Sequence, residues 1–147
     1  MGKNEGRTAP AGKEGARSMM EATRFESHDY NGIPAVEVVG EVDISNVDEF
    51  ELALERAANR DTGVVVISLV RASYFDSRTI HVLYRFAERL ETNRQKMVIV
   101  APSEGSAKRI LKITGLANVV AHFSTLEEAL ASGVETVRRR TNGEYDT

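Results

Sequence analysis

The sequence contains no cysteine among its 147 residues, and this absence removes several classes of function at once. A chain without cysteine forms no disulfide, holds no thiolate-bound metal and offers no cysteine nucleophile. Tryptophan is absent as well, and aromatic residues make up only 6% of the chain. The sequence therefore has no basic-aromatic stripe of the kind that binds RNA. The formal net charge of −3 provides no general attraction to nucleic acid or to anionic lipid.

Long apolar stretches are also missing. The longest apolar run, residues 63–70, is far shorter than the roughly 20 residues that a membrane span needs. The first residues lack the apolar segment that marks a signal peptide. We therefore expect no membrane partner and a cytoplasmic location, which the lack of cysteine fits.

Motifs for catalysis and for cofactor binding are missing too. The three histidines, His28, His81 and His122, are far apart in the sequence and show no metal-ligand spacing such as HExxH. The glycines form neither a dinucleotide-binding GxGxxG pattern nor a phosphate-binding GxxxxGK[ST] loop. No GxSxG nucleophile elbow occurs. We expect a protein that is not an enzyme and that has no cofactor and no metal site.

The composition that remains is that of an ordinary globular domain. Hydrophobic residues make up 41% of the chain and charged residues 28%, and the length fits one domain. Residues 1–23 are rich in Gly, Ala, Lys and Glu without apolar periodicity, which predicts a flexible N-terminal tail. The domain is expected over 24–138, with a C-terminal tail over 139–147. The basic triplet 138–140 fits the end of a helix, where cations interact favourably with the helix dipole.

Periodicity predicts alternating strands and helices. Two short strands, 25–30 and 35–39, flank Asn31-Gly32, a strong hairpin signal. The β-branched runs 64–67 and 97–100 are typical of strands buried on both faces, and 119–120 is expected to add a short edge strand. Four helical patterns follow the spacing of apolar residues, with start signals at Ser45, at Ser103 and at the capping box Ser124–Glu127: 47–57, 80–90, 103–114 and 126–137.

This order of elements predicts an α/β fold. The expected sheet is mixed, has four to five strands with a mostly parallel centre, and is flanked by about four helices joined through right-handed crossovers.

The stretch from Arg71 to Ile80 is the unusual part of the sequence. It lies between a buried strand and a helix, at the edge where open α/β sheets place functional groups. Asp76 and Ser77 occupy the expected N-cap position, but capping explains only one of them. It does not explain three hydroxyl side chains and two arginines in one short segment. A hydroxyl at a helix N-terminus is also a favourable place for a phosphate.

The same stretch resembles a known family. The segment VVVISLVRASYFDSRTIHVLYRF is similar to the strand, loop and Asp-Ser-Ser/Thr-Gly-Leu motif of STAS domains, which include bacterial anti-sigma factor antagonists. Upstream, Gly40-Glu41-Val42-Asp43 resembles the family's Gly-Glu-Leu/Ile-Asp. Downstream, 113–116 and 124–130 resemble its closing segment. The resemblance covers about residues 24–138 and implies a STAS-like fold.

In antagonist members, the first serine of the motif is phosphorylated by an anti-sigma factor that is itself a serine kinase. The unphosphorylated antagonist binds this kinase and releases the sigma factor, and phosphorylation breaks the complex. The resemblance implies that Ser77 is the phosphate acceptor. It also implies a partner-binding surface that consists of Asp43, Asp76, Ser77, Arg78 and Thr79.

The sequence departs from the family pattern at three positions. Arg78 replaces a small hydroxyl residue, Thr79 replaces glycine, and Ser68 stands where many members have aspartate. Thr79 is therefore an alternative acceptor for the phosphate. Tyr74 and Phe75, just before the motif, are interpreted either as part of the partner surface or as ordinary core residues.

Two other functions remain open from the sequence. One is a STAS scaffold or sensor-assembly subunit whose site is not phosphorylated, and the other is a STAS module that binds a small molecule or a nucleotide. An oligomer is compatible with either.

Overall fold

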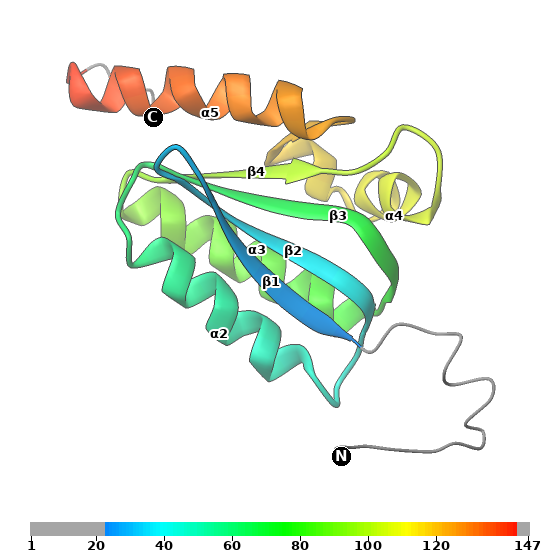
Figure 1. The fold of residues 1–147 in the computed structure, drawn as a ribbon. Coiled ribbons are helices and arrows are strands. Elements are labelled where there is room, and N and C mark those ends of the chain that lie inside the picture. Colours follow the sequence, from blue (N-terminus) through cyan, green and yellow to red (C-terminus); the bar gives the residue numbers. More distant parts are fainter. Residues whose placement is uncertain (1–22, 144–147) are drawn as a thin grey trace, which may run out of the picture.

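Residues 23–143 are described by the computed structural model. They form a sheet of five strands with helices on both faces (Figure 1). The elements in chain order are β1 (Arg24–Tyr30), β2 (Ile33–Val42), α2 (Val47–Ala58), β3 (Val64–Phe75), α3 (Ser77–Thr92), β4 (Lys96–Val100), α4 (Ser106–Thr114), the short 3-10 helix η1 (Leu116–Asn118), β5 (Ala121–Phe123) and α5 (Leu126–Thr141). The expected N-terminal tail lies outside the described residues except for Thr23.

The sheet is mixed, as the sequence predicts. Its strand order is β1-β2-β3-β4-β5, with β1 antiparallel to β2 and every later neighbour parallel. The hairpin between β1 and β2 turns at Asn31 and Gly32, whose φ angles are 56° and 93°. Positive φ at both central residues is the geometry of the type I′ turn, which Asn-Gly favours.

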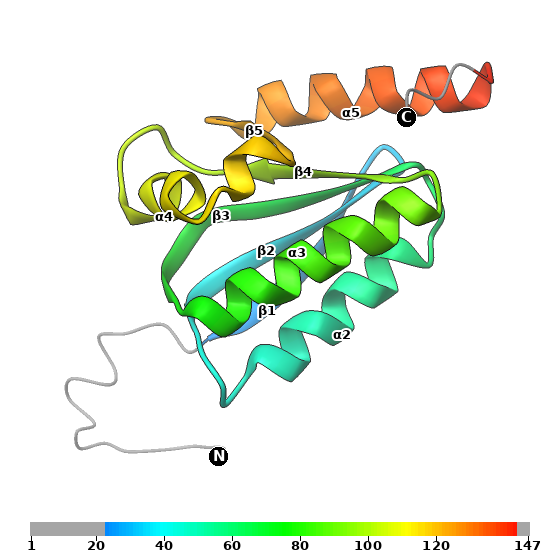
Figure 2. The ribbon, with the colours of Figure 1, turned by 180° about the vertical axis from the view of Figure 1, so that it is seen from behind.

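Two apolar clusters hold the layers together. On one face, α2, α3 and α4 pack against the sheet through a cluster that includes Phe50, Leu83 and Leu111. On the other face, α5 packs through Ala129 against Val64 and Val98. Figure 2 shows α2 and α3 side by side beneath the sheet and α5 across its opposite face. The fold class and the element order expected from the sequence are confirmed, with four α-helices in the described part of the chain.

Three helix starts differ from the sequence prediction. Asn46, not Ser45, precedes the first turn of α2, because the Ser45 hydroxyl donates to Asp43 Oδ1 instead. Helix α4 begins after Gly105, three residues later than expected from Ser103. The cap of α5 is Thr125, whose hydroxyl oxygen accepts the N–H of Glu128 at 3.2 Å. The capping box is thus displaced by one residue.

Two strands also differ. β3 continues to Phe75, far beyond the predicted end at residue 67, because β2 extends to Val42 and offers pairing partners up to the pair Val42–Phe75. The edge strand is present but covers 121–123 and not 119–120. Val120 instead donates its N–H to Leu116 O and so closes the turn after η1.

The basic triplet lies within α5, which ends at Thr141 and so extends beyond the expected domain limit at 138. Arg138 and Arg139 form ion pairs with Glu135 one turn earlier. Arg140 pairs with Asp61 at 2.8 Å and so connects the end of α5 to the loop before β3. Within the described residues, no helix is long and apolar enough to cross a membrane.

Candidate functional site

The carboxyl ends of β2 and β3 lie next to each other. Val42 pairs with Phe75 in the parallel ladder, and after these residues the chain turns into α2 and α3 respectively (Figure 2). Asp43 and Asp76, which are distant in sequence, therefore follow neighbouring strands. The structure brings all five residues predicted for the partner surface to this one end of the sheet. Open α/β sheets hold their functional groups at this edge.

Asp76 and Thr79 build the start of α3. Asp76 is the N-cap, and its Oδ1 accepts the N–H groups of Arg78 at 3.1 Å and Thr79 at 3.2 Å. Thr79 is only 2% exposed. Its hydroxyl lies 3.3 Å from Asp76 Oδ1 and 3.5 Å from the carbonyl oxygen of Val42. Thr79 thus joins the start of α3 to the end of β2 from inside the fold.

Ser77 and Arg78 point the other way. Both are exposed residues in the first turn of α3, a turn that contains no acidic residue. The N-terminal end of a helix carries a partial positive charge, and here the Asp76 carboxylate caps it. Ser77 is therefore a solvent-accessible hydroxyl beside the capped start of α3.

Asp43 is held in place by its own loop. Its Oδ1 accepts the Ser45 hydroxyl at 2.6 Å and the Ser45 N–H at 2.9 Å. These hydrogen bonds favour the charged form and lower the pKa of the Asp43 carboxyl. The Asp43 N–H donates to Asn46 Oδ1 at 3.0 Å. Asp43 therefore presents a fixed negative charge at neutral pH.

Two large apolar side chains lie exposed beside these polar groups. Ile44 is 68% exposed and Tyr74 is 51% exposed. Phe75, by contrast, is 4% exposed, so the core interpretation is correct for Phe75 and wrong for Tyr74. Ile44 was not identified from the sequence. The signal was present, because an isoleucine between Asp43 and Ser45 belongs to no helical or strand periodicity. We call the following six residues the strand-end surface: Asp43, Ile44, Tyr74, Asp76, Ser77 and Arg78.

Comparison with protein families decides the identity of the fold. The model of the STAS domain family matches residues 24–129, which include the strand-end surface and all five strands. This chain belongs to the STAS domain family. The match ends within α5. Its residues lie within the range 24–138 over which the sequence resembles STAS domains.

Solved STAS-like structures share the fold. An anti-sigma factor antagonist from Mycobacterium paratuberculosis has a TM-score of 0.64 and 24% identity, with 76% of this chain and 93% of that chain covered. A putative anti-sigma factor antagonist from Thermotoga maritima has a TM-score of 0.66 and 22% identity, with 78% and 95% covered. The phosphorylated form of the Bacillus cell fate determinant SpoIIAA has a TM-score of 0.57 and 18% identity, with 76% and 98% covered. No curated protein matches the sequence.

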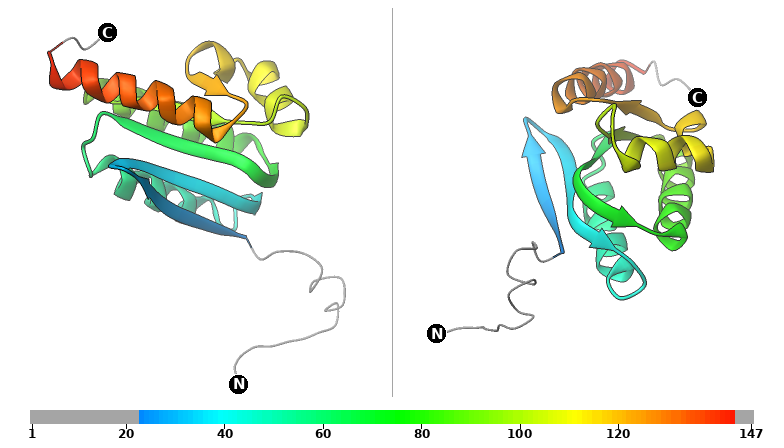
Figure 3. Two further views of the ribbon diagram at one scale, coloured as in Figure 1. Left: turned by 45° about the horizontal axis from the view of Figure 1, so that its top comes forward. Right: turned by 90° about the vertical axis from the view of Figure 1, so that its right-hand side faces the viewer.

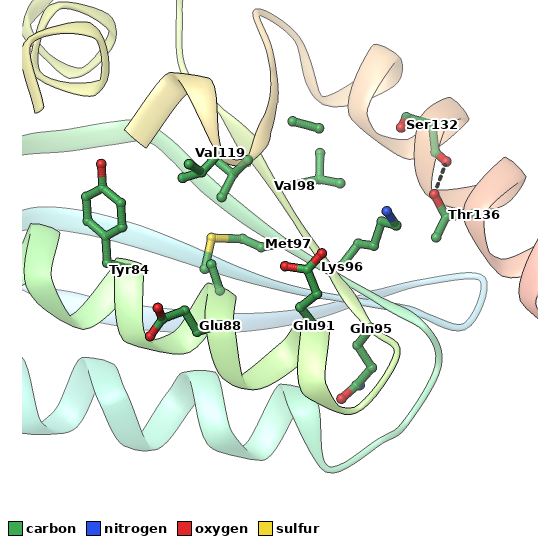
Figure 4. Close-up of a pocket in the computed structure, with 13 residues that line it drawn as sticks. Tyr84, Glu88, Glu91, Gln95, Lys96, Met97, Val98, Val119, Ser132 and Thr136 are labelled. Carbon is green, nitrogen blue, oxygen red and sulfur yellow. Dashed lines mark hydrogen bonds between the residues drawn. The ribbon is translucent and has the colours of Figure 1, made fainter. Parts of the chain in front are cut away.

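A groove of about 410 Å³ lies apart from the strand-end surface, between α3, β4 and α5 (Figure 4). Its floor is apolar and includes Met97 and Val98, and Glu88, Glu91 and Lys96 stand at its rim. A group with spacing suited to a metal ion, Glu26, His28 and Glu37, lies elsewhere again, on β1 and β2. The groove and the Glu26–His28–Glu37 group therefore both lie apart from the strand-end surface.

Proposed function

We propose that this STAS domain is an anti-sigma factor antagonist that acts by partner switching in the bacterial cytoplasm. In this function it catalyses no reaction. It binds an anti-sigma factor of the serine-kinase type through the strand-end surface and thereby frees the sigma factor. Phosphorylation of Ser77 by the same kinase ends the complex. The antagonist structures with the same fold support the choice of partner.

The observation that carries the proposal is the position of Ser77. It is exposed in the first turn of α3, next to Asp76 and at the same end of the sheet as Asp43. A phosphate adds a charge of about −1.5 to −2. Placed beside two carboxylates in an interface, that charge costs both repulsion and desolvation. In the free domain, Ser77 is exposed to solvent, so water solvates the phosphate and this cost does not arise.

Ser77 and the alternative phosphate acceptor, Thr79, differ in their burial. A kinase must reach the hydroxyl that it modifies, and the Thr79 side chain is buried with its hydroxyl directed to Asp76 and Val42. Phosphorylation of Thr79 would require the start of α3 to open. We therefore place the phosphate on Ser77 and give Thr79 a structural part in the surface.

The apolar residues of the strand-end surface suit a protein partner. Interfaces place aromatic and apolar side chains at the centre and charged groups around them. Ile44, next to Asp43, and Tyr74, two residues before Asp76, supply exposed side chains of this kind. A tyrosine in a desolvated interface commonly contributes more than 1 kcal/mol when truncated.

Binding variants test the surface. The anti-sigma factor recovered from native cytosol with the full chain is purified, and its affinity is measured by calorimetry. Asp43→Asn and Tyr74→Ala should each weaken binding roughly tenfold, which corresponds to about 1.4 kcal/mol. Val134→Ala removes an equally exposed apolar side chain from α5 and should leave binding unchanged. Loss of folding in the first two variants, seen by thermal unfolding, would assign these residues to structure instead.

The groove at β4 favours a second candidate function, the binding of a small molecule. Its floor is apolar, and at its rim the two carboxylates of Glu88 and Glu91 outnumber the single ammonium group of Lys96. This lining fits an apolar molecule with a cationic group better than a nucleotide phosphate, because like charges repel. Hydrophobic amines titrated against the chain should raise its melting temperature, and Ala87→Trp, which fills the groove, should abolish the effect. An equal rise in the melting temperature of the Ala87→Trp variant would show that the amines do not bind in this groove.

A further inference from the structure

The open part of the sheet carries a group of charged side chains that the proposed function does not use. Figure 3 shows α5 along one side of the sheet, with β1 at the other side, and on this face α5 covers only the start of β2, at Ile33 and Ala35. Glu26 on β1 and Glu37 on β2 are direct partners across the antiparallel ladder. Their side chains are 30% and 20% exposed. Like charges directly opposite each other destabilise a sheet, and the guanidinium groups of Arg24 and Arg71 lie near the pair and reduce this repulsion.

His28 lies between the two carboxylates. Its Nε2 is 3.6 Å from Glu26 Oε1 and 3.4 Å from Glu37 Oε1. This nitrogen is buried and has no hydrogen-bond partner among the described residues. Both separations exceed the roughly 2.7–3.2 Å of an ordinary N–H···O hydrogen bond. The His28 side chain as a whole is 35% exposed, but its Nε2 faces two carboxylate oxygens and forms a hydrogen bond with neither.

The spacing matches that of ligands around a metal ion. In a tetrahedral site with bonds of about 2.0–2.1 Å to nitrogen and oxygen, neighbouring ligand atoms stand roughly 3.3–3.4 Å apart. The three ligand atoms of Glu26, His28 and Glu37 all lie within 4.8 Å of one another. Small side-chain rotations bring them to this geometry, because none of the three is fully buried.

We propose that Glu26, His28 and Glu37 bind a divalent first-row transition metal ion, with Zn²⁺ as the representative. His28 supplies Nε2, each glutamate supplies its Oε1, and water completes the coordination. An imidazole ligand favours this class over Mg²⁺ and Ca²⁺, which prefer oxygen ligands only. The bound ion cancels the Glu26–Glu37 repulsion and cross-links β1 to β2. Sequence reasoning missed the group because its members come from two strands that the hairpin brings together.

Two arginines shape this site in opposite ways. Arg24 donates to Glu26 Oε2 at 2.5 Å, which leaves Oε1 for the metal and holds the carboxylate in place. Arg71 Nη1 lies 3.8 Å from both Glu26 Oε1 and Glu37 Oε1, so its charge competes with the ion for the same two oxygens. Removal of the Arg71 charge should therefore strengthen metal binding, a result that a purely structural ion-pair network does not predict.

Calorimetric titration of the metal-free full chain with Zn²⁺ at neutral pH tests the site. We expect one ion per chain and a higher melting temperature in its presence. His28→Gln and Glu37→Gln should each weaken binding at least tenfold, since loss of even an outer-shell partner costs roughly 10–100-fold. Arg71→Gln should bind Zn²⁺ more tightly than the unaltered chain. His81→Gln, on the exposed face of α3, is the matched control and should bind as the unaltered chain does.

A second readout separates ligation from folding. Without metal, Glu37→Gln should keep a melting temperature close to that of the unaltered chain, because it loses both the repulsion by Glu26 and the attraction to His28 and Arg71. Undiminished Zn²⁺ affinity in His28→Gln or Glu37→Gln would overturn the proposal. Equal affinity for Mg²⁺, or weaker binding in Arg71→Gln, would overturn it as well. None of these outcomes bears on partner binding at the strand-end surface.

Discussion

Asp76 and Ser77 are neighbours in the chain but contribute to different properties. Asp76 uses its carboxylate to close the first turn of α3, whereas Ser77 presents its hydroxyl to solvent. The same helix start thus contains one residue for stability and one for the proposed regulation. Substitutions at the two positions should separate these effects.

Asp76→Ala should destabilise the domain by about 1 kcal/mol, the typical cost of removing an N-cap side chain. Asp76→Asn should retain most of the stability, because asparagine caps helices about as well as aspartate. Ser77→Ala should change stability by less than about 0.5 kcal/mol. Chemical denaturation measures all three. Equal stability of Asp76→Ala and the unaltered chain would show that the cap contributes nothing.

Ser45→Ala should lower stability at neutral pH and have a smaller effect in acid. Asp43 has a lowered pKa in the folded protein because Ser45 donates two hydrogen bonds to its carboxylate. The stabilisation is fully present above the pKa that Asp43 has in the unfolded chain. It is lost as the pH falls through the lower pKa of the folded protein. The check is the difference in unfolding free energy between variant and unaltered chain as the pH falls.

A difference that stays constant over this pH range would show that the Ser45 hydroxyl acts through something other than the charge of Asp43. Ser103→Ala, at an exposed position before α4, is the control for loss of a hydroxyl and should show no pH-dependent change.

At the scale of elements, the irregular end of β2 positions the strand-end surface. The pairing of β2 with β3 shifts register between Gly40 and Glu41, and Gly40 has a φ of +95°. A Cβ at this position would lie 3.1 Å from Thr23 Cα. The glycine of the Gly-Glu-Val-Asp motif is therefore required by the backbone of the strand and by the close approach of Thr23.

Gly40→Ala should destabilise the domain by about 1–2 kcal/mol, the cost of a left-handed conformation for a residue with a Cβ, and by more if Thr23 cannot move. Glu41→Ala at the neighbouring exposed position should stay within about 0.5 kcal/mol. Thermal unfolding of the two variants measures this difference in stability. A Gly40→Ala variant as stable as Glu41→Ala would contradict the assigned role of the glycine.

Periodicity predicted the existence of each of these elements but not all of their limits. The β-branched run ends at Ile67, so nothing in Arg71-Ala72-Ser73 suggests that the strand continues. It continues because β2 offers partners to Arg71, Ala72, Tyr74 and Phe75, which is information from outside the segment. The start of α2 was misplaced for a similar reason, since Asp43 takes the Ser45 hydroxyl that a cap would use.

At the scale of the whole molecule, the parallel pairing of β2 and β3 assembles the strand-end surface. Because the two strands end together, their following loops meet, and the resemblance to STAS domains implied that Asp43 and Asp76 belong to one surface. The sequence did not predict that the Thr79 hydroxyl is buried. The exposure of Ser77 and the burial of Thr79 follow from the direction in which α3 leaves the sheet, a property of packing and not of local pattern.

Phosphorylation followed by mass spectrometry tests the central claim most directly. The full chain is incubated with the anti-sigma kinase that binds it and with ATP, and the modified residue is identified. The account predicts phosphate on Ser77, its loss in Ser77→Ala, and release of the kinase from the phosphorylated chain. Absence of phosphate with a kinase that demonstrably binds would contradict the account and favour a STAS scaffold that is not switched.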